Sequence, residues 1–326
     1  MDDSIPWIET YRPYKIKDLI IDPMLKNKIN KIIEDHEMPH IIITGVPGIG
    51  KTSTLMCIAR ELLGKYLEDG LLELNGSDER GIKAKDTIET FCKKKIGHSK
   101  DKHKYHKIVL IDEADNLTQK SQQQINGIIS QYEKNTRFAF TCNTSSKILR
   151  AIQSRCIIIR YKRLDSDVLK ERLEFICNNE KIEYKEDALQ EITNISKGDM
   201  RKAINFLQNV YNGYNKIHLD HVLTMCDKPQ HNLVTEIFST ILKSDLTTSL
   251  KHLNVLFDKG YSGSDLIITM LEILKSKYYN KINEAQRIAF MIVLSKYMFK
   301  TSHGLDNKYQ LMACICEMYL QNKKLN

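Results

Sequence analysis

The chain has 326 residues, of which 42% are hydrophobic and 28% are charged, and this composition is typical of a globular protein with room for two or three domains. Its apolar runs fall short of the ~20 residues of a membrane helix and its first residues lack the features of a secretory signal, so we expect an intracellular protein that does not span a membrane. The net charge of +8 suggests a polyanionic partner, and eight cysteines without a C-x-x-C pair argue against a zinc site or a disulfide framework.

The first forty residues predict a surface segment, a helix and the approach to a strand. The stretch from Pro6 to Pro13 has two prolines and three large side chains, which favour an extended conformation packed against a surface. A helix is expected from Met24 to Glu34. The apolar run from His40 to Thr44 predicts a short buried strand.

A glycine-rich stretch follows that strand and matches the pattern G-x-x-x-x-G-K-[ST] of phosphate-binding loops. A helix is expected directly after it, from Lys51 to Leu63. Glycines allow backbone N–H groups to approach a polyanion, and the N-terminus of the helix adds its dipole. Lys51 would contact the β- and γ-phosphates and Thr52 would ligate Mg²⁺, whereas the alternative is a chance glycine turn. The nucleotide-binding candidates of this loop are Gly45, Val46, Pro47, Gly48, Ile49, Gly50, Lys51, Thr52 and Ser53.

An acidic pair ends a later apolar strand. A strand from Leu71 to Leu74 leads into a polar turn and a helix, and the next strand begins at Lys107 and ends in Asp112 and Glu113. In ATPases with a phosphate loop, the first carboxylate positions Mg²⁺ and the second polarises the attacking water. The pair could instead be a solvated strand tip. The phosphate loop roughly 60 residues upstream favours the catalytic interpretation.

Strands and helices continue to alternate up to residue 161. The predicted order is a helix over 119–131, a strand over 137–143, a short helix over 148–153 and a strand over 157–161. Continuous apolar strands that alternate with helices predict an α/β fold with a parallel sheet covered on both faces. Ligands bind at the carboxyl ends of such strands, and Thr44, Asp112 and Asn143 all fall there.

The strands stop after Leu164. Three helices are expected over 165–179, 185–196 and 198–211, and the pattern is helical throughout from about residue 228. We therefore predict a nucleotide-binding domain at 1–162, a helical lid at 163–227 and an all-helical domain at 228–326.

Positive charge is concentrated between residues 93 and 107, where seven lysines accompany the single acidic residue Asp101. Such a segment either binds a polyanion or is a solvated loop.

These landmarks together resemble the small subunits of replication factor C, the clamp loaders of the AAA+ ATPase class, over nearly the whole chain. The Ser-Arg-Cys triplet and the tyrosine–arginine–proline opening are specific to that family, whereas other AAA+ proteins share the phosphate loop and the acidic pair. The stretches that carry the resemblance are Pro6-Trp-Ile-Glu-Thr-Tyr-Arg-Pro13, the phosphate loop, residues 72–81, Asp112-Glu-Ala-Asp115, Asn135-Thr-Arg-Phe138, Gln153-Ser-Arg-Cys156 and residues 198–205.

The resemblance implies roles for further residues. Asn143 would orient the attacking water, the lid arginine Arg201 would reach the terminal phosphates, and Arg155 would act as an arginine finger on ATP held by a neighbouring subunit. The alternatives are surface ion pairs for Arg12 and Arg201 and a strand cap for Asn143. The positions that match the family's adenine pocket are Ile8, Arg12 and Ile20.

Family members work as a five-subunit ring that opens a sliding clamp and sets it around primer–template DNA. The resemblance thus implies ATP and Mg²⁺ as cofactors, with other clamp-loader subunits, a sliding clamp and primer–template DNA as partners. The C-terminal helices would form the collar of the ring, and Arg80 and Lys83 are the candidates for DNA phosphate contacts. The expected location is the nucleus of a eukaryotic cell, or the replication compartment of the host cell for a viral protein.

The sequence departs from the family pattern at two places. The usual Ala-Leu-Arg-Arg is replaced by Gln124-Ile-Asn-Gly127, which puts in doubt any basic contact from that helix and introduces a glycine that costs about 1 kcal/mol relative to alanine. Asn75-Gly-Ser77 replaces the usual Asn-Ala-Ser.

Two other functions compete with an active clamp-loader subunit. One is a structural ring member that binds nucleotide without hydrolysing it; the presence of Lys51, Thr52, Asp112 and Glu113 argues for activity. The other is a different AAA+ machine such as a branch-migration motor, and the Ser-Arg-Cys triplet and the collar argue against that.

Overall fold

A computed structural model describes residues 5–77, 82–94, 106–225, 231–275, 282–304 and 306–325. The chain forms two compact units, Met1–Val222 and Leu223–Asn326, which we describe one at a time. No helix in the described part of the chain combines the length and apolar character that crossing a bilayer requires.

The first unit is built on a five-stranded parallel sheet. Its strands are β1 (Ile41–Thr44), β2 (Leu71–Asn75), β3 (Lys107–Asp112), β4 (Thr136–Cys142) and β5 (Ile157–Arg160). Their spatial order is β2-β3-β4-β1-β5, and each neighbouring pair is parallel. The parallel α/β sheet predicted from the alternation of strands and helices is confirmed.

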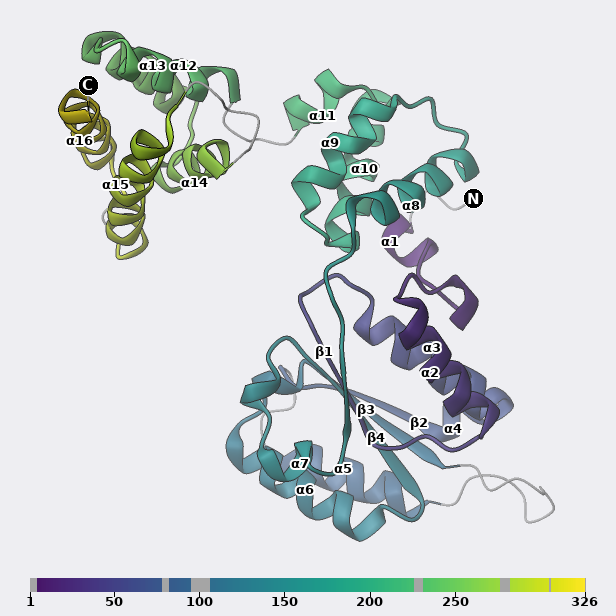
Figure 1. Ribbon diagram of the computed structural model, residues 1–326. Helices are drawn as coiled ribbons and strands as arrows, with labels where there is room; N and C mark the ends of the chain where they lie inside the picture. Colours follow the sequence, from purple (N-terminus) through teal and green to yellow (C-terminus); the bar gives the residue numbers. More distant parts are fainter. Residues whose placement is uncertain are drawn as a thin grey trace. The chain divides into compact units, whose positions relative to one another are not determined.

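Helices cover both faces of the sheet because its strands are apolar on both sides (Figure 1). Along β1, Ile41 and Ile43 belong to one buried cluster, whereas Ile42 belongs to the other, as the two-residue period of a strand requires. The first cluster packs against α2 (Pro23–Glu34) and α3 (Lys51–Leu63). The second packs against α5 (Ile82–Lys93), α6 (Gln119–Tyr132) and α7 (Arg150–Gln153). Shorter helical turns are α4 (Leu67–Gly70), η1 (Ile16–Asp18), η2 (Gly64–Tyr66), η3 (Ala114–Asn116) and η4 (Ser145–Lys147).

The strand pairing brings the carboxyl ends of several strands to one edge. Thr44 at the end of β1 pairs with Cys142 at the end of β4, and Asn75 at the end of β2 pairs with Asp112 at the end of β3. The residues that follow these strands therefore converge on one region, which is where an open parallel sheet binds its ligands.

The segment before the sheet differs from the prediction. Residues Trp7–Thr10 form a one-turn helix, α1, rather than an extended stretch. Pro6 has φ −58° and its carbonyl accepts hydrogen bonds from the N–H groups of Glu9 and Thr10, so the proline starts a turn. The prediction of packing against a surface holds, because Trp7 is buried and its ring lies 5.4 Å from that of Tyr211.

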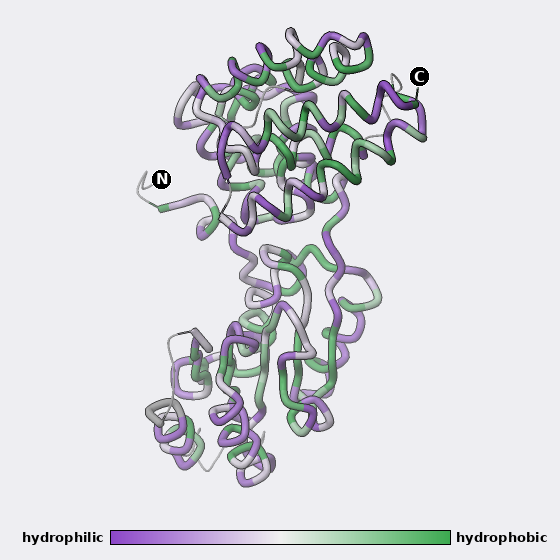
Figure 2. The backbone as a smooth tube through the Cα atoms, turned by 90° about the vertical axis from the view of Figure 1, so that its left-hand side faces the viewer, coloured by the Kyte–Doolittle hydropathy of each residue, from purple (hydrophilic) through white to green (hydrophobic). Residues whose placement is uncertain are grey.

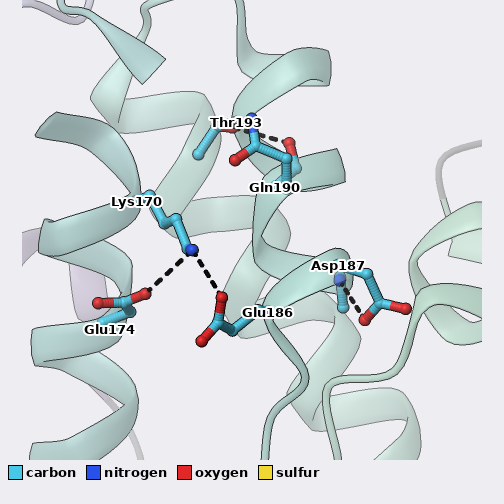
Figure 3. A network of polar contacts seen from close by, with 7 residues as sticks. Lys170, Glu174, Glu186, Asp187, Gln190 and Thr193 are labelled. Carbon is cyan, nitrogen blue, oxygen red and sulfur yellow. Dashed lines mark hydrogen bonds and ion pairs between the residues drawn. The ribbon is translucent and has the colours of Figure 1, made fainter. Parts of the chain in front are cut away.

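Helices complete the first unit after β5. They are α8 (Ser166–Asn179), α9 (Glu186–Ser196) and α10 (Met200–Tyr214), and the next helix, α11 (Leu219–Met225), begins in the first unit and ends in the second. Lys170 on α8 bridges Glu174 of its own helix, at 3.7 Å, and Glu186 at the start of α9, at 3.1 Å (Figure 3). Asp199 caps α10, since its carboxylate accepts a hydrogen bond from the N–H of Lys202.

The described residues of the second unit are helical, as predicted. The helices are α12 (His231–Leu242), α13 (Leu246–Asp258), α14 (Gly263–Lys275), α15 (Glu284–Ser302) and α16 (Lys308–Leu325). Hydrophobic and hydrophilic stretches alternate along them (Figure 2), and their inward faces form one core around Phe238 and Phe290. A buried polar pair crosses this core, because Gln286 donates to Asn322, which donates to the carbonyl of Ile241.

Candidate nucleotide-binding site

The phosphate loop has the backbone shape that its glycines allow. Gly48 and Gly50 have φ values of 71° and 88°, in the left-handed region that other residues rarely adopt. A Cβ atom on Gly48 would lie 1.7 Å from a carboxylate oxygen of Asp199, and the N–H of Met200 donates to the Gly48 carbonyl at 3.0 Å. The start of α10 therefore rests directly on the loop.

Lys51 points its ammonium group into a ring of oxygen acceptors. Its Nζ donates to the carbonyls of Gly45 and Val46, at 2.7 and 2.8 Å, and to Oδ1 of Asn143 at 2.9 Å. Burial lowers the pKa of Lys51, and the carboxylate of Asp112 opposes that shift. These acceptors use the three N–H donors of the ammonium, and the charged oxygens of a bound phosphate would take the place of some of them.

Thr52 and Asp112 lie side by side. The Thr52 hydroxyl donates to the two carboxylate oxygens of Asp112, at 3.0 and 2.9 Å. Thr141 on β4 donates to the same carboxylate and fixes it from the other side. A hydroxyl and a carboxylate are hard oxygen donors of the kind that Mg²⁺ prefers, so this pair fits the predicted metal position.

Glu113 is held in a definite place by two polar neighbours. It adopts φ 50°, and its carboxylate accepts hydrogen bonds from the Ser77 hydroxyl at 2.6 Å and from the Asn116 amide at 3.0 Å. A Cβ atom on Gly76 would lie 2.5 Å from the Glu113 carbonyl oxygen. The glycine that departs from the family pattern thus permits the close approach of β2 to the acidic turn.

A cleft joins these groups to the segment around α1 and to α10. Its empty volume is about 1210 Å³, its open mouth included, which accommodates a nucleoside triphosphate. Arg12 lines the cleft and also pairs with Glu9 at 3.3 Å, so the alternative ion pair is present, and the role of Arg12 toward the base stays a prediction. The other predicted site residues that line the cleft are Ile8, Ile20, Pro47, Gly48, Ile49, Gly50, Lys51, Thr52, Ser53, Asp112, Glu113, Asn143 and Arg201.

Arg155 lies away from this cleft. It precedes β5, whereas the phosphate loop follows the carboxyl end of the neighbouring parallel strand β1. Arg155 instead borders a second depression with His40 and Arg137, and its guanidinium lies 3.9 Å from the carboxylate of Glu133. Burial lowers the pKa of His40 to about 4, so this histidine is neutral at physiological pH.

The residues predicted to contact DNA lie outside what the structure describes. These residues are Arg80 and Lys83, the second of which is described only in its backbone. Residues 95–105 of the lysine-rich segment also lie outside the described part of the chain. Lys107, however, fits neither alternative for that segment, polyanion binding or a solvated loop, because it is the buried first residue of β3. It is 3% exposed, and its ammonium donates to the carbonyls of Phe91 and Lys94 at the end of α5. Its positive charge therefore stabilises the C-terminus of that helix.

Several residues of the site were not predicted from the sequence. Ser77 and Asn116 follow β2 and the acidic pair, and their positions just after strands are the signal that could have identified them. Thr141, inside an apolar strand, carries no such signal. Arg172 on α8 also lines the cleft, and it belongs to none of the motifs that carry the resemblance.

The sheet, the phosphate loop and the acidic pair define a P-loop ATPase. The family model for the ATPase family associated with various cellular activities matches residues 41–164, which span the phosphate loop and the acidic pair. Solved structures of the Thermotoga maritima Holliday junction branch migration motor share the fold, with a TM-score of 0.54 and 20% identity over 76% of this chain and 85% of that chain.

The chain belongs to the replication factor C small-subunit family. The replication factor C C-terminal domain model matches residues 229–317, and the lid domain model of the RCF1/5-like AAA+ ATPases matches residues 171–211. An Acanthamoeba polyphaga mimivirus protein named as a replication factor C small subunit is 41% identical over 98% of both chains. Replication factor C subunit 4 of Saccharomyces cerevisiae is 37% identical over 98% of both chains. The small subunit of Aeropyrum pernix is 34% identical over 98% of this chain and 97% of its own.

The protein is accordingly an ATP-hydrolysing subunit of a clamp-loader complex. The branch-migration motor is not favoured, because the likeness to it extends only to the fold. A ring member that does not hydrolyse ATP is not favoured either, because the chain matches the AAA ATPase model and replication factor C small subunits.

Proposed function

We propose that this subunit binds ATP with Mg²⁺ in the cleft described above, joins a hetero-pentameric ring, and helps to open a sliding clamp and load it onto primer–template DNA at the site of replication. The observation that carries the proposal is the convergence of Lys51, Asp112, Glu113, Asn143 and Arg201 on one cleft. These groups supply a phosphate-binding cation, a metal-binding carboxylate, a base and two polar groups aimed at the terminal phosphate. The domain bounds 1–162, 163–227 and 228–326 belong to the same proposal. The lid and C-terminal models match within the last two ranges, and the AAA model matches residues 41–164, which end two residues past the first boundary.

The roles of the individual groups follow from their chemistry. Lys51 holds the β- and γ-phosphates, and Arg201 reaches them from α10. Thr52 and Asp112 would hold Mg²⁺, which neutralises phosphate charge when bound. Glu113 is the general base, and Asn143 orients the attacking water.

Glu113→Gln should keep nucleotide affinity near the wild-type value while hydrolysis becomes at least ~100-fold slower, because only the step that needs a polarised water is affected. Titration calorimetry measures the affinity, and phosphate release measures turnover. Glu68→Gln is the matched control, since Glu68 is an exposed glutamate on α4 and does not line the cleft. Turnover in Glu113→Gln equal to that of the wild type would refute the role of Glu113 as base.

Binding to DNA should rest on backbone phosphates without base preference, because a clamp loader must act at any primer end. Arg80 and Lys83, next to the start of α5, remain the candidates. Fluorescence anisotropy of the assembled complex with primer–templates of several sequences, measured across a salt series, should give one common affinity that falls as salt rises. A strong dependence on sequence, or affinity that does not change with salt, would contradict the proposal.

A further inference from the structure

Arg172 is a cation that lines the cleft and belongs to none of the sequence motifs described above. Its guanidinium is half-buried, donates from Nη2 to the carbonyl oxygen of Tyr11 at 2.8 Å, and lies 4.9 Å from the ring centroid of Phe175. Burial lowers the pKa of Arg172, opposed by the charge of Asp18, yet an arginine remains cationic. A planar guanidinium that both stacks on a ring and donates to a carbonyl holds its partner in a fixed orientation.

Helix α8 and the residue after it bind both the backbone and the side chain of Tyr11. The carbonyl accepts from Arg172, and the phenol hydroxyl donates a short hydrogen bond to Glu180, the residue that caps α8. The ring of Tyr11 meets that of Phe175 edge-on, with 6.3 Å between the centroids. Tyr11 is therefore held by α8 as well as by its own short helix, where its N–H donates to the Trp7 carbonyl at 2.9 Å.

Tyr11 belongs to a wall that reaches from α8 to the helix of the phosphate loop. Ile8, Tyr11, Arg12 and Pro13 all line the cleft. At its far end the wall is attached to α3, because the thiol of Cys57 donates to the Pro13 carbonyl at 3.4 Å. Arg60 of the same helix lies 4.3 Å from the ring centroid of Tyr14.

This wall differs from the phosphate end of the cleft in chemistry. Ile8 and Pro13 lie there with the apolar residues Leu19, Ile20 and Ile21, which also line the cleft. A flat aromatic base needs such a surface, whereas a triphosphate needs the cations and N–H groups of the loop.

We propose that Arg172 is a positioning residue for the base of the nucleotide. By fixing the Tyr11 carbonyl to α8, it holds the wall from Ile8 to Pro13 where the base packs. This inference rests on the proposed function only in that ATP is the ligand of the cleft.

The test compares ATP with inorganic tripolyphosphate, which has the phosphates but no base, as ligands of the full chain in titration calorimetry. Arg172→Ala should weaken ATP binding about tenfold, the size expected for a lost charged hydrogen bond, and leave tripolyphosphate binding within about twofold. Arg172→Lys, which keeps one donor, should recover part of the ATP affinity. Lys170→Ala is the matched control, because it removes a cation two residues away on α8 that pairs with Glu174 and Glu186 (Figure 3).

Each other outcome overturns the proposal. Equal weakening of both ligands would make Arg172 a phosphate contact, and unchanged affinity for both would make it a purely structural residue. If Arg172→Ala does not fold, Tyr11→Phe tests the same wall by removing the hydrogen bond to Glu180, and it too should weaken ATP but not tripolyphosphate. Failure of the wild type to bind ATP would instead refute the proposed function itself.

Discussion

Lys51→Ala should show no measurable ATP binding. The ammonium of Lys51 is the cation at the centre of the phosphate loop, where it already contacts the carbonyls of Gly45 and Val46 and the amide oxygen of Asn143. Alanine removes this cation from the loop, and the charge-assisted hydrogen bonds to the β- and γ-phosphates are lost. Titration calorimetry with ATP and Mg²⁺ measures the effect directly.

Lys120→Ala is the control for a general loss of positive charge, since Lys120 is an exposed lysine on α6. It should bind ATP as the wild type does. Wild-type affinity in Lys51→Ala would show that the glycine-rich loop does not hold the phosphates, and it would remove the basis for every other role assigned in the cleft.

Arg155→Ala should lower hydrolysis at the site of the adjacent subunit by ~10³-fold or more, while ATP affinity at this subunit's own site stays near normal. The reason is its position. Arg155 precedes β5, and the four-residue strand β1 beside it separates that edge of the sheet from the phosphate loop by about 13 Å at the usual rise of ~3.3 Å per residue. An arginine there is too far from its own phosphate loop to contact a γ-phosphate held in that loop, which leaves ATP on another subunit as its expected target.

The measurement is made in a reconstituted ring whose other subunits are wild type, with turnover assigned to individual sites. Arg150→Ala, an exposed arginine on the preceding helix α7, is the matched control. Glu133→Ala tests the alternative that Arg155 serves only its 3.9 Å ion pair, because both substitutions would then have the same small effect. Loss of ATP binding at this subunit's own site with normal turnover at the neighbour would contradict action in trans.

The predictions from sequence succeeded where a residue's type and its place in a pattern determine its environment. Ile41 to Thr44 had to form a buried strand, and the glycines and Lys51 after it had to form a phosphate loop, because few other structures suit those residues. Asp112 and Asn143 followed from the rule that parallel strands end at one edge.

The rest depended on contacts between distant parts of the chain. Nothing near Arg172 in the sequence indicates that it meets Tyr11, 161 positions earlier. Lys107 was assigned to a basic surface because it follows other lysines, whereas the end of α5 accepts its hydrogen bonds and buries it. The segment from Pro6 to Pro13 was expected to be extended because it contains two prolines. The helical turn that it forms instead depends on the packing of Trp7 against Tyr211, which the local sequence does not reveal.

Helix α1 is a part of the cleft wall whose order depends on tertiary contacts. A single helical turn is unstable by itself and unfolds locally at low free energy unless tertiary contacts hold it. Here those contacts are the ring of Tyr211 and the hydrogen bond from the Trp7 N–H to Gln208, at 3.0 Å. Unfolding of this one turn would remove Ile8 and Glu9 from the cleft while every strand stays paired. The integrity of this part of the cleft wall therefore depends on the anchoring of Trp7 against α10.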